Sequence, residues 1–257
     1  MSSWVAGVDW AKEAWFGILV QDGEYRGYVV EKKIADLRKS IEHTDLTLID
    51  VPIGLPDSDG HLEQREDLDK QARRITGRPS SIFPVPTREA CEAAADGNPY
   101  AEVLEINRSI VGKGISRQSY NIAAQIYDVD VFLRRNPDLH DRVVESHPEV
   151  CFRGLFGQQL SRRKLSAAGV SERLQALDTV FDAPEALLSD VCQELESEDI
   201  DVSVDDVIDT LGLAATAAFP TDERRTLRPN GGGEVPVTDD EGLPMQMIYW
   251  TDSSNLR

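Results

Sequence analysis

The chain has 257 residues and a formal net charge of −19 at pH 7, with 46 acidic and 27 basic residues. This length suits one large α/β domain or two small ones, and either can bury a substantial core. No apolar stretch approaches the roughly 20 residues that span a bilayer, and the N-terminus lacks a signal-peptide pattern, so we expect a cytoplasmic protein with no membrane partner. The three cysteines are widely spaced without a CxxC pair, so neither a disulfide framework nor a zinc cluster is indicated.

The charge balance is typical of a protein adapted to very high salt. Only seven of the 27 basic residues are lysines, which leaves 27 − 7 = 20 arginines. At about 1 M salt the Debye length falls to about 3 Å, so self-repulsion of an acidic chain is largely screened. This interpretation predicts a halophilic source. In ordinary buffer the same charge would oppose binding to nucleic acid, and composition leaves both interpretations open.

The first 51 residues predict the core of a mixed β-sheet. Apolar runs at 4–8, 15–20 and 25–31 predict three strands joined by tight turns. Helical spacing of apolar residues predicts a helix over 34–43. The apolar run 46–51 then predicts a fourth strand, parallel to the first and reached through a right-handed crossover.

The middle of the chain, about residues 57–140, has the character of an insertion into that sheet. It begins with a basic, proline-rich stretch and continues with helical patterns over 99–110 and 119–135. A short apolar run at 142–146 predicts the fifth strand of the sheet.

The C-terminal part predicts helices and then an extension from about residue 220. The helices are expected at 171–177, 184–194 and 204–218. In the extension, 234–237 and 245–250 flank an acidic turn and predict a terminal hairpin. We therefore predict an α/β fold over residues 1–257, organised as a single domain with an insertion and a C-terminal extension.

Carboxylates recur where these predicted elements begin or end. Asp9 and Asp50 lie at the ends of predicted strands, Glu145 follows the run Val143-Val144, and three aspartates open the helix predicted at 204–218. Hard divalent cations such as Mg²⁺ prefer oxygen ligands, and a pair of ions needs several carboxylates from different elements. The pattern therefore indicates a candidate acidic metal centre.

Each of these carboxylates also has a structural interpretation. Asp9 could form a turn, and Asp50 could accept hydrogen bonds from the turn that follows it. Asp206 lies three residues after Ser203, which is the spacing of a capping box. Asp209 shares a helix face with Asp206 and also with Asp205, so spacing alone does not choose between the last two.

Several basic and amide side chains are candidates for contact with phosphate or substrate. Arginine suits phosphate because its guanidinium donates two parallel hydrogen bonds, although surface ion pairing is the commoner role. The amides could bind substrate or cap helices. The candidates are Arg74, Arg78, Arg88, Gln118, Asn121 and Lys164.

Several strings in the chain resemble one known family. They are GVDWAKEAWF, IDVPIGLP, ARRITGRPSSIFPVPTR, GISRQSYNIAAQIYDVD, ESHPEVCF and DDVIDTL, in that order. Together they resemble the DUF429 family of predicted nucleases over nearly the whole chain. The resemblance implies an RNase H-like, RuvC-related fold with a mixed five-stranded sheet flanked by helices. It also implies a centre for Mg²⁺ or Mn²⁺, with the ligands Asp9, Asp50, Glu145, Asp206 and Asp209, and it favours Asp206 over Asp205.

From the residues and the resemblance together we expect a metal-dependent nuclease that hydrolyses phosphodiester bonds of RNA or DNA. The expected catalytic residues are Asp9, Asp50, Glu145 and Asp209. One alternative is a non-catalytic nucleic-acid or protein-binding module that keeps the scaffold. Another is a phosphoryl-transfer enzyme of the actin-like group, which the missing glycine-rich loop after Asp9 disfavours. The oligomeric state stays open, with a dimer as one option.

Overall fold

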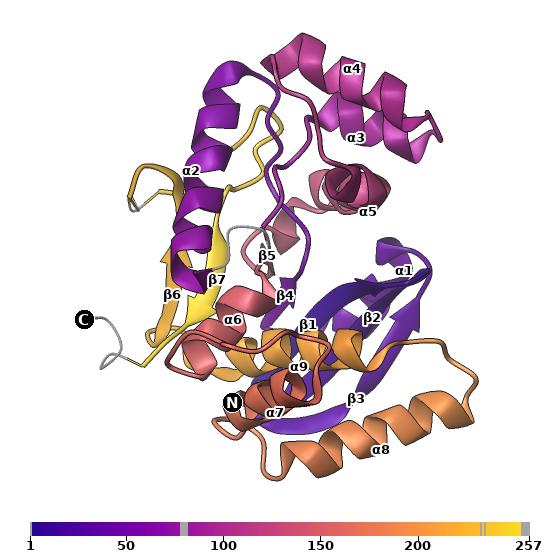
Figure 1. Cartoon of the computed structure of the whole chain (residues 1–257), viewed down its shortest axis with the longest axis vertical. Helices are drawn as coiled ribbons and strands as arrows, with labels where there is room; N and C mark the ends of the chain where they lie inside the picture. Colours follow the sequence, from indigo (N-terminus) through magenta and orange to yellow (C-terminus); the bar gives the residue numbers. More distant parts are fainter. Residues whose placement is uncertain (1, 78–81, 232, 234, 253–257) are drawn as a thin grey trace. The chain divides into compact units, whose positions relative to one another are not determined.

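The computed structural model describes residues 2–77, 82–231, 233 and 235–252 (Figure 1). Its α-carbon contacts divide the chain into two compact units. The first unit comprises Met1–Asp50, Ser146–Arg225 and Ile248–Arg257, and the second comprises Val51–Glu145 and Thr226–Met247. The insertion predicted at 57–140 thus lies wholly in the second unit, while the predicted C-terminal extension contributes to both.

The sheet has the mixed topology that the sequence predicts. Strands β1 (Trp4–Ala11), β2 (Ala14–Gln21) and β3 (Glu24–Glu31) form an antiparallel meander. Strand β4 (Leu46–Ile49) follows helix α1 (Ile34–Ile41) and runs parallel to β1. With β5 (Val143–Glu145) the strand order is β3-β2-β1-β4-β5. The predicted α/β class and five-stranded mixed sheet are confirmed.

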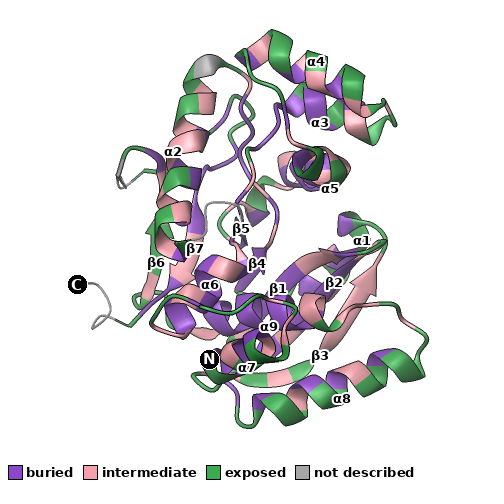
Figure 2. Ribbon diagram, viewed as in Figure 1, coloured by how far each residue is buried: buried purple, intermediate pink, exposed green. Residues whose placement is uncertain are grey.

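Four helices of the first unit follow β5 in the chain: α6 (Pro148–Leu155), α7 (Ala167–Leu177), α8 (Pro184–Ser197) and α9 (Val204–Ala218). Helix α9 contacts β1, β2 and β4, and α6, α7 and α8 contact α9 in turn. Every residue of α9 from 207 to 217 is buried (Figure 2). A helix that is apolar all round after an acidic first turn is suited to such a central position.

Gly7 allows β1 and α9 to approach each other at backbone distance. A Cβ atom added at Gly7 would lie 2.3 Å from the carbonyl oxygen of Thr210 and 2.5 Å from the amide nitrogen of Ala214. Both neighbours are backbone atoms, which cannot rotate away as a side chain can. A side chain at this position would therefore force the helix away from the strand that carries Asp9.

The second unit contains four helices in the described part of the chain: α2 (Asp59–Thr76), α3 (Arg88–Ala95), α4 (Tyr100–Val111) and α5 (Arg117–Arg134). A 3₁₀ turn at Pro137–Leu139 precedes β5. Helices α4 and α5 match the patterns predicted at 99–110 and 119–135. Helix α2 was not predicted, because two of its buried positions hold Arg65 and Asp69 in place of apolar residues.

The C-terminal hairpin is confirmed, but its first strand differs from the prediction. Strand β7 (Met247–Trp250) pairs with β6 (Arg224–Leu227), which precedes a 3₁₀ turn at Pro229–Gly231. The segment predicted as the first strand, 234–237, begins outside the described residues. Next to this segment, the side chain of Asp239 accepts hydrogen bonds from two backbone amides of its own turn. The β-type pairing in this part of the described chain is limited to the isolated bridge between Thr238 and Pro244. None of the helices in the described ranges is long and apolar enough to cross a membrane.

Candidate metal centre

Two of the predicted ligands project from neighbouring parallel strands of the first unit. Asp9 lies on β1, and Asp50 directly follows β4. Val8 is opposite Ile49 in the register, and the amide of Asp50 donates to the carbonyl oxygen of Val8 at 3.0 Å. Equivalent positions on adjacent parallel strands point to the same face. The register therefore brings the two partly exposed carboxylates, Asp9 and Asp50, to one side of the sheet.

Helix α9 supplies two further aspartates with different surroundings. Asp209 is only 6% exposed, and its Oδ2 accepts from Lys164 Nζ at 2.5 Å. Its Oδ1 is buried and has no hydrogen-bond partner among the described residues. Asp206 takes part in the capping box of its own helix, since its Oδ2 accepts from the amide of Ser203 and its own amide donates to Ser203 Oγ, both at 3.4 Å. The unsatisfied oxygen of the centre thus belongs to Asp209.

The pKa of Asp9 shows that these carboxylates interact. Burial raises the pKa of Asp9 most, and the charges of Asp50, Asp209 and Asp206 raise it further. The amide of Trp10 donates to Asp9 Oδ1 at 2.7 Å and opposes the shift only in part. A carboxylate beside like charges prefers to be protonated unless a cation is near. Burial and the neighbouring aspartates therefore favour the protonated form of Asp9 in the absence of a cation.

Lys164 is the basic residue that bonds Asp209, and the charge of Arg173 also acts on that aspartate. Its Nζ lies 3.2 Å from Asp205 Oδ2 as well as 2.5 Å from Asp209 Oδ2. Burial opposes the charged ammonium, but the two aspartates raise the pKa of Lys164 above its ordinary value. The pKa of Asp209 is nevertheless raised to about 6, because burial outweighs the effect of Lys164. The positive charges of Lys164 and Arg173 thus do not fully offset the effect of burial on Asp209.

The donor set fits a divalent cation that prefers oxygen ligands. It offers carboxylates with raised pKa values and one buried oxygen without a partner. In the described ranges, however, no three carboxylates of this group offer one oxygen each such that all three oxygens lie within 4.8 Å of one another. Binding of one ion by three of these carboxylates would therefore require side-chain rotation.

Glu145 has a different environment, inside the second unit. It is 3% exposed, and its two oxygens accept from Nη1 and Nη2 of Arg65, the former at 2.6 Å. Its Oε2 also accepts from the amide of Ile53 at 2.8 Å. Arg65, which is 2% exposed, pairs with Asp69 as well. Glu145 therefore links α2 to β5 through a buried bidentate ion pair, a role that the sequence analysis missed.

The candidate substrate-binding residues are dispersed. Arg74, Gln118 and Asn121 are exposed on helices of the second unit, and Arg78 lies outside the described residues. Arg88 is only 9% exposed. Of the five candidates that the structure describes, Lys164 alone belongs to the first unit and contacts a predicted metal ligand.

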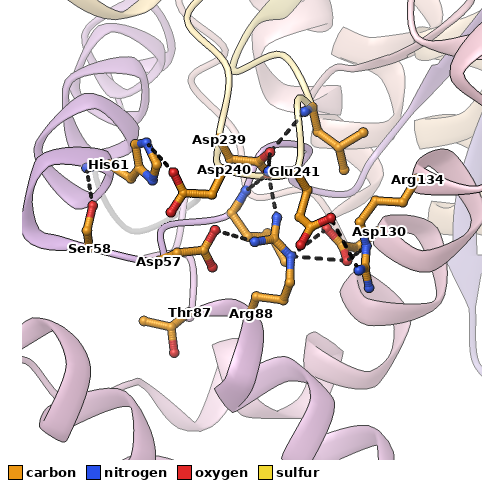
Figure 3. A network of polar contacts seen from close by, with 12 residues as sticks. Asp57, Ser58, His61, Thr87, Arg88, Asp130, Arg134, Asp239, Asp240 and Glu241 are labelled. Carbon is orange, nitrogen blue, oxygen red and sulfur yellow. Dashed lines mark hydrogen bonds and ion pairs between the residues drawn. The ribbon is translucent and has the colours of Figure 1, made fainter.

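Arg88 is the centre of a polar network in the second unit (Figure 3). Its Nη1 pairs with Asp57, its Nη2 donates to Asp239 at 2.6 Å, and its Nε donates to Asp130 at 3.2 Å. These partners are 31, 151 and 42 residues away in the sequence, so no local pattern could have identified them. All three guanidinium nitrogens of Arg88 therefore contact carboxylates of its own unit.

A family model described as "Protein of unknown function (DUF429)" matches residues 7–231. No curated protein and no solved structure matches the chain. The matched range includes Asp9, Asp50 and Asp209, and it covers most of the sequence. On this match, the chain belongs to the DUF429 family.

Proposed function

We propose that the chain is a divalent-metal-dependent nuclease that hydrolyses phosphodiester bonds of nucleic acid. Asp9, Asp50 and Asp209 are its metal ligands in this proposal. The observation that carries it is the buried, unpartnered Oδ1 of Asp209, which belongs to a group of carboxylates that raise the pKa of Asp9. An unsatisfied buried acceptor costs about 1–3 kcal/mol, and a cation would remove that cost.

The proposal includes an RNase H-like architecture. Its support is the antiparallel meander β1-β2-β3 followed by the parallel strand β4, with Asp9 inside β1 and Asp50 directly after β4. Helix α9 then adds Asp209 from a third element. Ligands on strands and a central helix are held more firmly than ligands on loops.

The chain's own residues have separate tasks in this reaction. Mg²⁺ or Mn²⁺, when bound, would activate a water molecule and stabilise the leaving oxygen. As ligands on and beside strands, Asp9 and Asp50 would position the metal relative to the sheet. Lys164 stays protonated at neutral pH and can donate to a phosphate oxygen, since an ammonium offers three donors. Asp206 holds the first turn of α9 in place through its cap with Ser203.

Glu145 is left out of the proposed ligand set. Both of its oxygens accept hydrogen bonds from Arg65, and Oε2 also accepts from Ile53. Releasing Glu145 to a metal would leave a buried guanidinium without its main partner, which costs several kcal/mol.

One observation favours a second candidate, a non-catalytic nucleic-acid or protein-binding module. The ammonium of Lys164 already bonds Asp209 and Asp205, and no three carboxylates of the centre can share an ion without side-chain rotation in the described ranges. In a scaffold that has lost catalysis, the ammonium of such a lysine would neutralise the aspartates that a metal ion neutralises in an active enzyme.

Cleavage assays with one matched pair of variants test the proposal. Labelled single-stranded, duplex, hybrid and junction substrates are offered with Mn²⁺ or Mg²⁺ in about 1 M KCl, where the Debye length is about 3 Å. We expect Asp50→Asn to lower the rate by about 100-fold or more, the scale for losing one group that stabilises a transition state. Asp222→Asn, at an exposed aspartate of the same unit, should cleave like the wild type.

Two outcomes contradict the nuclease. Equal cleavage by wild type and Asp50→Asn would show that the activity comes from elsewhere. Absence of cleavage, together with absence of Mn²⁺ binding by calorimetry, would favour the binding module.

A further inference from the structure

The second unit contains a group of three potential metal ligands that the sequence did not indicate. Ligand atoms of Asp57, His61 and Asp240 all lie within 4.8 Å of one another (Figure 3). Asp57 precedes helix α2, and His61 lies in its first turn, where its amide donates to the N-cap Ser58. Asp240 comes from the turn before β7. Two separate segments of the unit therefore converge on one point.

The ring of His61 lacks the hydrogen bonds that a structural histidine normally makes. Its Nδ1 is buried and has no partner among the described residues. Its Nε2 lies 3.7 Å from Asp240 Oδ1, which is beyond hydrogen-bond distance. The side chain is 18% exposed, so water reaches only part of it. A bound ion or a water molecule would satisfy such a buried ring nitrogen.

The charge around the three residues also favours a cation. In the network of Figure 3, Arg88 and Arg134 are the basic groups that pair with the carboxylates. The carboxylates are Asp57, Asp130, Asp239, Asp240 and Glu241. Five negative and two positive charges give −5 + 2 = −3. A divalent cation would offset most of this excess.

The ion pair between Asp57 and Arg88 does not prevent coordination. Arg88 Nη1 contacts Oδ2 of Asp57, and a carboxylate offers two oxygens. Burial raises the pKa of Asp57 although Arg88 opposes the shift. One guanidinium therefore does not fully stabilise the charged carboxylate in this position.

We propose that Asp57, His61 and Asp240 bind a transition-metal dication of the Zn²⁺ class. One imidazole and two carboxylates suit Zn²⁺ or Co²⁺, whereas Mg²⁺, Ca²⁺ and Mn²⁺ prefer oxygen ligands. The side chain of Asp240 is 68% exposed, so a further coordination position is open to water on that side. The site is separate in ligands and in chemistry from the carboxylate centre of the proposed nuclease.

A metal at this position would fasten the start of α2 to the turn that carries Asp240. The same turn is already held by Asp239, whose Oδ2 accepts from the amide of Leu55 at 2.9 Å and from Arg88. An ion that binds the folded state only also stabilises it by mass action. Binding should therefore raise the melting temperature as well as give a spectroscopic signal.

Titration with Co²⁺, followed by its visible absorption, tests the site in the full-length protein. We expect a visible band that saturates in the wild type and competes with Zn²⁺. His61→Ala and Asp240→Asn should each weaken Co²⁺ binding by at least about tenfold, the lower end of the loss for altering even the surroundings of a metal ligand. His43→Ala should bind like the wild type, because the side chain of His43 is 80% exposed and pairs only weakly with Glu42.

The Asp50→Asn variant separates this proposal from the nuclease. The Co²⁺ band should persist in Asp50→Asn even if nuclease activity is lost, and its loss there would place the absorbing ion at the other centre. Absence of a band and of Zn²⁺ binding heat in the folded wild type would overturn the site. An unchanged Co²⁺ affinity in Asp240→Asn would also overturn the site. This variant alters an exposed turn residue, so it decides the question if His61→Ala fails to fold.

Discussion

Asp9 lies among carboxylates that, together with burial, raise its pKa. Asp9→Asn keeps the acceptor for the amide of Trp10 and removes one negative charge from the group. We therefore expect the variant to be more stable than the wild type in EDTA at pH 7. A gain of about 1 kcal/mol corresponds to a rise in Tm of about 2–4 °C for a chain of this size, measurable by calorimetry. Mn²⁺ should reverse the order, and a lower Tm of Asp9→Asn in EDTA would contradict this account.

Asp209 gives the centre a pH dependence whose sign follows from its raised pKa. The folded state holds this proton up to a pKa of about 6, whereas an ordinary aspartate loses it near pH 4. The stabilising contribution is complete below about pH 4 and is lost as the pH rises through 6. About two pKa units correspond to at most about 3 kcal/mol.

Urea denaturation in EDTA between pH 4 and 7 measures this effect. The stability of Asp209→Asn relative to the wild type should increase over that range, because the amide does not titrate. Metal affinity of the wild type should rise through the same range, since ligation needs the deprotonated carboxylate. A difference between the two proteins that does not vary with pH would disprove the assignment.

At the scale of elements, the approach of α9 to β1 depends on Gly7. In Gly7→Ala the new methyl group would meet backbone atoms of Thr210 and Ala214 at 2.3 and 2.5 Å. We expect a loss of about 1–3 kcal/mol in the free energy of unfolding, as for overpacked cores, together with weaker metal binding by Asp209. Gly114→Ala is the matched control, because its Cβ would meet only side chains at ordinary distances of 3.5 Å or more. Equal urea midpoints for the two variants would refute the close approach.

The link between α2 and β5 distinguishes a structural Glu145 from a ligand. Glu145→Gln weakens a buried pair with Arg65, so we expect a loss that approaches the 3–5 kcal/mol typical of removing one partner. Replacement of both Glu145 and Arg65 by leucine should recover part of this loss. Mn²⁺ affinity at the first-unit centre, measured by calorimetry, should not change in the folded variant. A large loss of affinity with unchanged stability would restore Glu145 as a metal ligand.

These elements also show which features the sequence could predict. The five strands of the sheet and α9 were predictable because largely apolar runs encode them, and parallel register then places Asp9 beside Asp50. Helix α2 was missed because the charged residues Arg65 and Asp69 occupy part of its buried face. Glu145, the partner of Arg65, is 80 residues away in the sequence. Pairing of Asp209 with Lys164, 45 residues apart, was hidden for the same reason. Long-range polar contacts leave no period in the sequence.

For the molecule as a whole, the net charge of −19 sets the balance between repulsion and ion pairing. Surface pairs such as Lys113 with Glu66 and Arg26 with Glu24 are partly exposed and contribute little. Repulsion among the remaining carboxylates acts over longer distances, so salt screens it more than it weakens close pairs. The acidic composition should therefore make added salt stabilising at neutral pH.

Thermal unfolding in KCl tests this expectation and its cause together. Raising KCl from about 0.1 M to about 1 M shortens the Debye length from about 10 Å to about 3 Å, so Tm at pH 7 should increase. Salt can also stabilise by strengthening apolar burial, and this effect does not depend on the protein's charge. The sequence pI is about 4.6, and at that pH the repulsive contribution vanishes. An increase in Tm that is equally large at pH 4.6 would show that burial, and not charge screening, causes the stabilisation.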